Sequence, residues 1–433
     1  MATVQARTED ASPVGYGELV RQNYNFRNLW FGQIISLLGD WFNLIASAAL
    51  IGQLTESGLA VGSLFVVRML APFLISPIAG VVADRYNRKW ILLTTDLVRA
   101  VVVFGFLFVR QADDLWLLYT LTAIQLGISG FFFPARNAIL PDIVSPRELG
   151  AANALSSATW SVMLALGAAL GGLASGVWGI RPAFVIDGLT FFASAWFIWH
   201  IRLAPRAELS AAEKTLGAAL RQYVDGLRYL TQRMDVLLIT LHKAVNSLIL
   251  SSGFQVIQVA IAQHVFTYGE GGGISLGLMF ALAGVGTGIG PIVARYFSGD
   301  DNKRLRWFIA LGYIIGGLGL LFTAPLPNFT TVLIGTALRG IGGGIIWVFS
   351  TQLLMQLVPG HVRGRVFATE FAFFNLASAA AAAVIGGALD SSLGLSTIIW
   401  WMAAFSVVPT VLWTAWLVGG QRDAPEQAAH VAD

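Results

Sequence analysis

Residues 80–90 read GVVADRYNRKW and place one acid and three bases between two long apolar runs. The run before them is VGSLFVVRMLAPFLISPIA (residues 61–79), and the run after them is ILLTTDLVRAVVVFGFLFV (residues 91–109). About 20 mostly apolar residues are enough to cross the hydrocarbon layer of a bilayer as a helix. The charged stretch is therefore expected to be a short turn between two membrane-spanning helices.

The composition extends this interpretation to the whole chain. Of the 433 residues, 56% are hydrophobic and 12% are charged, whereas a soluble chain carries about 25% charged residues. We therefore expect an all-α polytopic membrane protein. Its twelve expected spans lie near 29–54, 60–82, 90–109, 115–135, 151–178, 182–203, 236–263, 273–294, 306–324, 329–355, 367–389 and 396–418.

Several kinds of chemistry are disfavoured by residue content. The chain has no cysteine, and its five histidines stand singly without metal-ligand spacing, so we expect no metal site and no cofactor. No phosphate-binding G-x-x-x-x-G-K-[ST] stretch is present, which argues against nucleotide hydrolysis as the energy source. No group of catalytic residues is recognisable, so we do not expect an enzyme.

The basic residues orient the expected spans. They gather in the loops on the side of residues 80–90, while the opposite loops hold only Arg110 and Arg181. The positive-inside rule places the basic loops and both termini in the cytoplasm of a multi-pass protein of the cell membrane, which we expect to be the bacterial inner membrane. The basic cytoplasmic loops thus account for the net charge of +3, and we expect no nucleic-acid partner.

The two halves of the chain resemble each other. QLGISGFFF (125–133) aligns with LRGIGGGII (338–346) at an offset of 213, and the same offset carries Pro146 onto Pro359. Parallel repeats of this size are typical of secondary transporters with a central site. We expect a cytoplasmic tail (1–28), a six-helix bundle (29–203), a cytoplasmic linker with an amphipathic helix (204–235), a second six-helix bundle (236–418) and a cytoplasmic tail (419–433).

The stretch GVVADRYNRK resembles the loop 2–3 signature of the major facilitator superfamily. Gly80, Asp84, Arg85, Arg88 and Lys89 match it, and Asn87 replaces the usual glycine, which asparagine can do because it tolerates a left-handed backbone. FGQIISLLGDWFN, FFFPARNAILPDIVSPRELGAANAL and HVRGRVFATEFAFFN resemble the branch of macrolide-efflux proteins and the enterobactin exporter. One departure from the antiporter pattern G-P-x-x-G-G is Ala168, which stands in the place of the proline.

The resemblance implies a fold and a function. It implies the major facilitator fold and proton-coupled efflux of amphipathic small molecules, with protons, a small-molecule substrate and membrane lipid as partners and a monomer as the working unit. Lipid or lysophospholipid transport by the same fold is an alternative. An intramembrane enzyme is disfavoured because no paired catalytic groups are evident. A non-transporting receptor is disfavoured because it would not need an acid at the membrane midplane.

The charged turn is interpreted as part of a cytoplasmic latch that holds the two halves together. Asp84 follows a long helix and is placed to accept hydrogen bonds from the free amides at the start of a helix in the other half. The bases are expected to pair with acids on the same face, and the plain alternative is a turn that only sets topology. The expected latch residues are Gly80, Asp84, Arg85, Arg88, Lys89, Asp142 and Glu370.

Charged residues inside the spans are the candidates for function, because they are costly in a membrane. Asp40, Arg68 and Arg339 lie deepest, about 12 to 16 Å from a membrane face at 1.5 Å per residue. We expect Asp40 and Arg68 to serve proton coupling, with a permanent Asp40–Arg68 salt bridge as the structural alternative. Asp96 and Arg99, three residues apart, are expected to form a structural ion pair.

The remaining candidates concern the cargo. Arg339 is interpreted either as an anchor for an anionic or carbonyl-bearing cargo or as a buried tie to Asp40 or backbone carbonyls. Asp187 is expected to tie span six to a neighbour, and Lys243 to extend toward the cytoplasmic interface. The residues expected at the substrate cavity are Asp40, Arg68, Arg339, Trp41, Phe132 and Trp347.

Overall fold

The computed structural model describes residues 14–203, 228–299 and 301–419 of the chain. Within these ranges the protein consists of helices and turns without a strand. Twelve helical segments in them are long and apolar enough to cross a membrane. The expected all-α polytopic fold is therefore confirmed.

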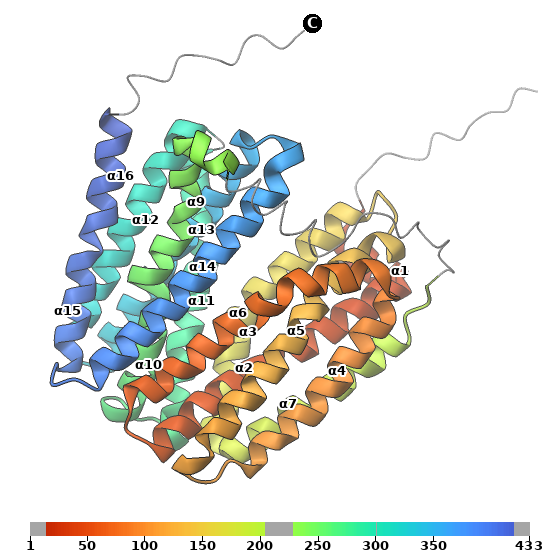
Figure 1. Ribbon diagram of the computed structural model, residues 1–433, viewed down its shortest axis with the longest axis horizontal. Coiled ribbons are helices and arrows are strands. Elements are labelled where there is room, and N and C mark those ends of the chain that lie inside the picture. Colours follow the sequence, from red (N-terminus) through yellow and green to blue (C-terminus); the bar gives the residue numbers. More distant parts are fainter. Residues whose placement is uncertain (1–13, 204–227, 300, 420–433) are drawn as a thin grey trace, which may run out of the picture.

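The helices form two groups along the chain (Figure 1). The first group is α1 (Tyr16–Gln22), α2 (Tyr24–Leu54), α3 (Gly58–Arg85), α4 (Arg88–Phe104), α5 (Leu115–Ile143), α6 (Leu149–Trp178) and α7 (Ile180–Trp199), with the 3-10 turns η1 (Gly105–Phe108) and η2 (Ala112–Asp114). We call α1 to α7 the N-terminal half. Each of α2 to α7 corresponds to one expected span.

The second group is the C-terminal half. It contains α9 (Met234–Asn246), the π-helical segment η3 (Ser247–Ser251), α10 (Ser252–His264), the turn η4 (Glu270–Gly272), α11 (Gly273–Ser298), α12 (Asn302–Thr323), α13 (Phe329–Leu357), α14 (Gly360–Leu389), α15 (Leu395–Phe405) and α16 (Val407–Gly419). Two of its spans contain two α-helices each: α9 and α10, with η3 between them, form one, and α15 with α16 forms another.

Polar residues at the starts of the spans explain where the helices begin. The side chains of Asn23, Ser57, Asn87, Asp301 and Asn328 each accept a hydrogen bond from a backbone N–H in the first turn of the following helix. Such caps satisfy amides that have no partner inside the helix. The expectation of a left-handed backbone at Asn87 is wrong: its φ is −63°, because the residue acts as a helix cap.

Several spans run past their expected ends. The helix α5 continues to Ile143 through Pro134 and Pro141, although the apolar run suggested an end near residue 135. The helix α3 likewise continues to Arg85, into the charged turn. The hydropathy pattern marks only the part that crosses the apolar layer, so it underestimates helices that extend beyond it. Most of the expected amphipathic helix at 204–235 lies outside the described residues.

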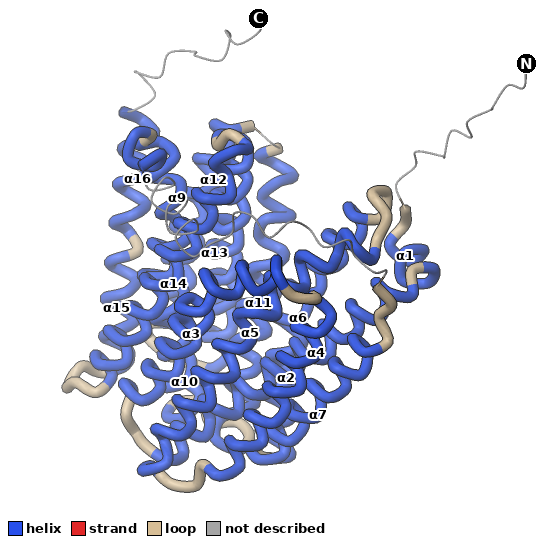
Figure 2. The backbone as a smooth tube through the Cα atoms, turned by 45° about the vertical axis from the view of Figure 1, so that its right-hand side comes forward, coloured by secondary structure: helices blue, strands red, loops and turns tan. Residues whose placement is uncertain are grey.

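Each half is a bundle with ends on two faces. We call the face at which α2 begins and α16 ends the proximal face, and the opposite one the distal face. The helices of the two halves meet toward the distal face and diverge toward the proximal face (Figures 1 and 2). The meeting helices are α3 with α14 and α6 with α11.

Glycines bring the two halves into backbone contact. A Cβ atom on Gly172 of α6 would lie 2.5 Å from Cα of Gly277 in α11, and a Cβ on Gly62 of α3 would lie 2.5 Å from the carbonyl oxygen of Ala382 in α14. Small residues allow membrane helices to approach this closely. We call these two glycine contacts the distal seal.

Asp390, directly after α14, adds a polar contact to the distal seal. Its carboxylate accepts hydrogen bonds from the Ser57 hydroxyl (2.7 Å), the Gly58 amide (2.5 Å) and the Leu59 amide (3.1 Å) at the start of α3. The acid therefore caps a helix of the other half, where negative charge is favourable. In this conformation the two halves are joined at the distal face.

Candidate functional site

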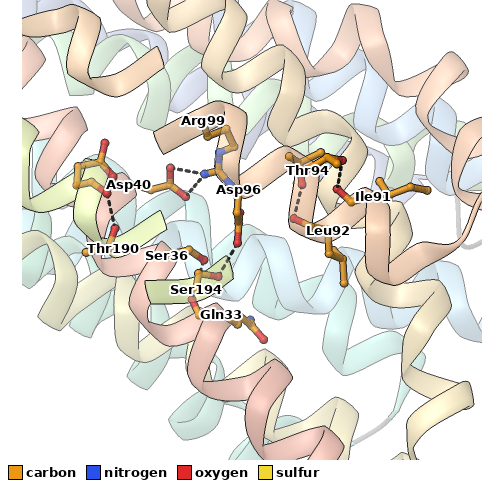
Figure 3. A network of polar contacts seen from close by, with 12 residues as sticks. Gln33, Ser36, Asp40, Ile91, Leu92, Thr94, Asp96, Arg99, Thr190 and Ser194 are labelled. Carbon is orange, nitrogen blue, oxygen red and sulfur yellow. Dashed lines mark hydrogen bonds and ion pairs between the residues drawn. The ribbon is translucent and has the colours of Figure 1, made fainter. Parts of the chain in front are cut away.

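Charged side chains gather inside the N-terminal half around Arg99 of α4 (Figure 3). Both oxygens of Asp40 in α2 accept hydrogen bonds from Nη2 of Arg99, at 2.8 and 3.0 Å. Asp96, one turn before Arg99, lies 3.4 Å from Nη1. The two carboxylates thus share one guanidinium: both oxygens of Asp40 contact Nη2, and one oxygen of Asp96 contacts Nη1.

The surroundings of Asp96 and Arg99 exclude water. Asp96 is fully buried and accepts a 2.6 Å hydrogen bond from the Ser194 hydroxyl of α7. The guanidinium carbon of Arg99 lies 3.9 Å from the ring centre of Phe191, and the Arg99 side chain is only 2% exposed. Asp40 differs, because its side chain is 25% exposed. The Asp96–Arg99 pair exists, but it is part of a larger cluster.

Asp187 of α7 is the third acid of this region. It is fully buried, and neither carboxylate oxygen has a hydrogen-bond partner among the described residues. Asn43 is close enough to act on this carboxylate, although its Nδ2 atom makes no hydrogen bond in good geometry. Gly39 makes room for the arrangement, since a Cβ there would lie 2.4 Å from Oδ1 of Asp187 and 2.0 Å from Oγ1 of Thr190. Asp187 is thus a buried acid without a fixed partner.

The expected partner of Asp40 is corrected by these distances. Arg68 of α3 forms no hydrogen bond or ion pair with any described residue, although the charges of Asp40 and Asp187 act on it. Span depth placed Arg68 at the height of Asp40, but the side chain that reaches Asp40 comes from α4. We call Asp40, Arg68, Asp96, Arg99 and Asp187 the acidic cluster: it contains three carboxyl groups and two guanidinium groups.

Trp41 connects the acidic cluster to the other half. Its ring centre lies 5.7 Å from that of Phe280 in α11. Gly167 of α6 lies against the same indole, since a Cβ there would be 2.6 Å from Cδ1 of Trp41. The glycines of the span with Ala168 therefore serve close packing around Trp41. Phe132, by contrast, is 6% exposed and packs in the core of the N-terminal half, so it presents no open wall to a cargo.

The C-terminal half contains a second buried charge pair. Nζ of Lys243 in α9 donates a 2.8 Å hydrogen bond to Oε2 of Glu370 in α14, and the two side chains are 8% and 3% exposed. The expected positions of both residues are wrong. Lys243 does not extend to the interface, and Glu370 pairs inside the C-terminal half, because α9 and α14 pack side by side.

Arg339 and Trp347, both on α13, lie in the same half. Nη1 of Arg339 donates a 3.1 Å hydrogen bond to the carbonyl oxygen of Leu250, in the π-helical segment η3, and its guanidinium lies 4.5 Å from the ring centre of Phe254. This contact agrees with the interpretation of Arg339 as a buried tie to a backbone carbonyl. Asp40 is not its partner. The ring of Trp347 lies over Nζ of Lys243, at 4.6 Å.

The charged turn makes its described contacts within the N-terminal half. Nη1 of Arg88 lies 2.5 Å from Oδ2 of Asp142, and Nζ of Lys89 donates a 2.8 Å hydrogen bond to the Ile201 carbonyl. The contacts of Gly80 and the side chains of Asp84 and Arg85 lie outside the described part of the structure. Where the two halves diverge, the described latch residues thus bind their own half.

Some residues of the site were missed from the sequence. Asn43, Thr190 and Ser194 line the acidic cluster, and Asp390 joins the halves. The available signal was the presence of polar side chains inside apolar runs and of an acid directly after a helix end. Neither signal identifies the residue that each of these side chains contacts.

Twelve spans in two halves, with buried charges in each half, define a polytopic membrane transporter. The sequence profile of the Major Facilitator Superfamily matches residues 29–368 and 301–432, so the chain belongs to this family. The expected family and the expectation that the chain is not an enzyme are both confirmed.

The relatives are distant. The chain is 28% identical to "Uncharacterized MFS-type transporter YfiS" of Bacillus subtilis, over 87% of this chain and 89% of the relative. It is 26% identical to "Putative bacilysin exporter BacE" of the same organism, over 81% of this chain and 85% of the relative.

Solved structures of transporters share the fold. The nucleoside transporter NupG superposes with a TM-score of 0.71 at 12% identity, over 92% of this chain and 99% of NupG. A bacterial homolog of the human lysosomal transporter Spinster, described as inward-facing and unoccupied, gives 0.71 at 16% identity, over 94% and 100%. At these identities the likeness establishes the fold alone.

Proposed function

We propose that this chain exports amphipathic small molecules, of drug, macrolide or siderophore-like character, in exchange for protons. The observation that carries the proposal is the excess of acid in the acidic cluster, where three carboxyl groups face two guanidinium groups inside a membrane-spanning bundle. Uncompensated charge is costly there, so the cluster holds one proton in at least one state of the cycle. The exporter name of one relative supports the direction of transport.

Asp40 is the site of proton exchange in this proposal. It is the only acid of the cluster with appreciable exposure, whereas Asp96 and Asp187 are fully buried. Protonation of Asp40 weakens its charge-assisted contact with Nη2 of Arg99, whose guanidinium then turns toward Asp96. Because Asp96 lies on α4 itself, proton binding thereby loosens the tie between α2 and α4.

Rocking of the two halves links this exchange to transport. Trp41 follows Asp40 and touches Phe280 of the other half, so separation at the distal seal moves the residue beside the proton site. The proximal face is cytoplasmic in this account, and the charged turn latches the halves when that face closes. The transporter works as a monomer in the cell membrane.

The test uses inside-out membrane vesicles with the overproduced chain. Acidifying the interior should drive accumulation of radiolabelled erythromycin and of ethidium, and a protonophore should abolish it. Vesicles without the chain control for other pumps. Accumulation of neither compound above that control, or accumulation that survives the protonophore, would refute proton-coupled export.

A further inference from the structure

A polar cavity lies at the proximal ends of α2, α4 and α7. Its volume is about 460 Å³, which is within the range of about 300–1,000 Å³ that is usual for small-molecule sites. Its lining includes Tyr24 at the start of α2, Lys89 and Trp90 in the first turn of α4, and Trp199 and Arg202 at and after the end of α7. Figures 1 and 2 show α4 and α7 on the side of the N-terminal half that faces away from the C-terminal half. A ligand in this cavity is therefore separate from a cargo that passes between the halves.

The two charged side chains in the lining of the cavity are both basic. Nζ of Lys89 donates one hydrogen bond, of 2.8 Å, to the Ile201 carbonyl, which leaves two of its three N–H donors for a ligand. The guanidinium carbon of Arg202 lies 5.6 Å from the ring centre of Tyr24, and Arg202 forms no ion pair with a described residue. Among the described residues that line the cavity there is no carboxylate. The cavity is therefore complementary in charge to an anion.

Hydrogen bonds hold the backbones of the two bases in place. Nδ2 of Asn25 donates to the carbonyl oxygen of Arg202 at 2.9 Å, and the amide of Arg202 donates to Oδ1 of Asn25 at 2.8 Å. This reciprocal pair ties the segment after α7 to the start of α2. Asn87 caps α4 by accepting a 3.0 Å hydrogen bond from the amide of Lys89. The cavity is therefore already formed before a ligand binds.

Two tryptophans place the cavity at the edge of the apolar layer. The ring centres of Trp90 and Trp199 lie 5.7 Å apart in an edge-on arrangement, and the two residues are 51% and 53% exposed. Nζ of Lys89 lies 5.5 Å from the ring centre of Trp199. Exposed tryptophans are enriched at the membrane–water interface, at the depth of the lipid head groups. The cavity is therefore level with the head groups of the leaflet on the proximal face.

Exposed apolar side chains continue from the tryptophan pair along both helices. Leu97 and Val101 lie about two and three turns after Trp90 on α4, and Phe192 lies about two turns before Trp199 on α7. Because α4 and α7 pack against each other, the two apolar faces run together from the cavity toward the distal face. Acyl chains can lie against these faces, whereas a soluble phosphate compound makes no use of them. The surroundings of the cavity therefore favour a lipid.

We propose that the cavity binds the head group of an anionic phospholipid of the proximal leaflet, of the phosphatidylglycerol or cardiolipin class, with its phosphate in contact with Lys89 and Arg202. Basic pockets between membrane helices suit such head groups. Phosphatidylethanolamine fits less well, because it brings an ammonium group close to two bases. The inference needs neither a cargo nor a proton and is independent of the proposed function.

The experiment counts the lipids that bind to the purified, delipidated full chain in detergent, by native mass spectrometry. The first molecule of dioleoyl-phosphatidylglycerol should bind at least about fivefold more tightly than the first molecule of dioleoyl-phosphatidylethanolamine. Arg202→Gln should weaken binding of the anionic lipid at least about fivefold, because one base beside its phosphate is lost. Arg304→Gln is the matched control, since it removes an exposed arginine at the start of α12, on the same face of the other half, and should leave binding unchanged.

A further arm separates a lipid from a soluble phosphate compound. Inorganic phosphate or glycerol 3-phosphate in large excess should not displace the bound phosphatidylglycerol, because neither compound has acyl chains. The inference is overturned by equal binding of the two lipids, by displacement with either soluble phosphate, or by a folded Arg202→Gln protein that binds phosphatidylglycerol like the wild type. An equal loss of binding in Arg304→Gln would overturn it too, because binding would then follow surface charge alone. The comparison of lipids needs no variant, so a folding defect in Arg202→Gln does not decide the outcome.

Discussion

Arg99 is the residue on which the acidic cluster depends, since its guanidinium contacts two carboxylates from two helices. Its Nη2 atom donates to both oxygens of Asp40, at 2.8 and 3.0 Å, and its Nη1 atom lies 3.4 Å from Asp96. Asp187 receives no such contact and is nevertheless fully buried. The three acids thus differ in how strongly their charge is compensated, so removal of Asp187 and removal of Arg99 should have opposite effects on stability.

Asp187→Asn should leave the thermal stability of the purified protein unchanged or raise it, because no hydrogen bond is lost and a buried charge is removed. Arg99→Gln should lower stability by at least about 3 kcal/mol, because it strands the acids that it pairs. Unfolding in detergent followed by tryptophan fluorescence compares the two. A large loss of stability in Asp187→Asn would show that Asp187 has a firm partner.

Charged positions in the spans can be predicted from sequence, but their partners cannot. Counting residues from a helix end gives the depth of a side chain and not the direction in which it points. Arg68 was therefore chosen for Asp40 on depth, whereas Arg99 reaches it from α4. The same counting places Lys243 at the cytoplasmic interface and Glu370 in the latch. Their pairing depends on the adjacency of α9 and α14, which no local pattern encodes.

At the level of elements, the distal seal depends on close contacts between helix backbones, which are possible because glycine carries no side chain. Gly172 and Gly277 allow α6 and α11 to touch through their backbones, and Gly62 does the same for α3 against α14. In the sequence, Gly171 and Gly172 of span five align with Gly386 and Gly387 of span eleven. Only the structure shows that the equivalent glycines do not all have equivalent contacts.

Gly172→Ala should hinder closure of the distal face, because the added Cβ would lie 2.5 Å from backbone Cα of Gly277 and cannot be relieved by a side-chain movement. Gly387→Ala is the matched control, since nothing lies within 4 Å of a Cβ at that position. Distances between spin labels at Arg110 and Pro327, on the distal loops of the two halves, report closure. Equal distance distributions in the two variants would contradict the assignment.

Asp390→Asn should raise the fraction of molecules that are open at the distal face about tenfold, since charge-assisted hydrogen bonds contribute about 1.5–3 kcal/mol. Partial burial acts to raise the pKa of Asp390, but the hydrogen bonds from Ser57, Leu59 and Gly58 outweigh it and lower the pKa below its ordinary value. A lowered pKa means that the contact is fully stabilising above the ordinary value and weakens as the pH falls through the lowered one.

Wild type and Asp390→Asn should therefore differ at pH 7 and converge as the pH falls below the ordinary carboxyl range of about 4. The same two spin labels measure this, and Asp113→Asn, which removes an exposed acid on the distal face, controls for surface charge. Identical distributions at pH 7 would remove Asp390 from the seal.

At the level of the whole molecule, the charge asymmetry of the loops predicts that the proximal face is cytoplasmic. The chain has no native cysteine, so single cysteines can be introduced without background. In intact cells, an impermeant maleimide should label Glu56→Cys on the distal face and should label Lys303→Cys on the proximal face only after permeabilisation. The reverse pattern would invert the topology.

The global fold is more predictable than the site. Twelve apolar runs, the repeat offset of 213 and the turn at 80–90 together determine the class, because each constrains the whole chain. The two halves nevertheless differ where charges occur. The offset of 213 carries Trp30 onto Lys243, but Trp30 makes a neutral hydrogen bond to Thr159, whereas Lys243 forms an ion pair with Glu370. Such differences between repeats indicate function, and symmetry alone does not predict them.

The central claim is that the acidic cluster carries the proton that drives export, with Asp40 as its exchange point. The most direct test compares two modes of erythromycin transport by Asp40→Asn in proteoliposomes. We expect uphill export driven by a proton gradient to be lost while downhill exchange stays within about twofold of wild type, because alternating access itself needs no proton carrier at residue 40. Uphill export at the wild-type rate by a normally inserted Asp40→Asn protein would contradict the claim.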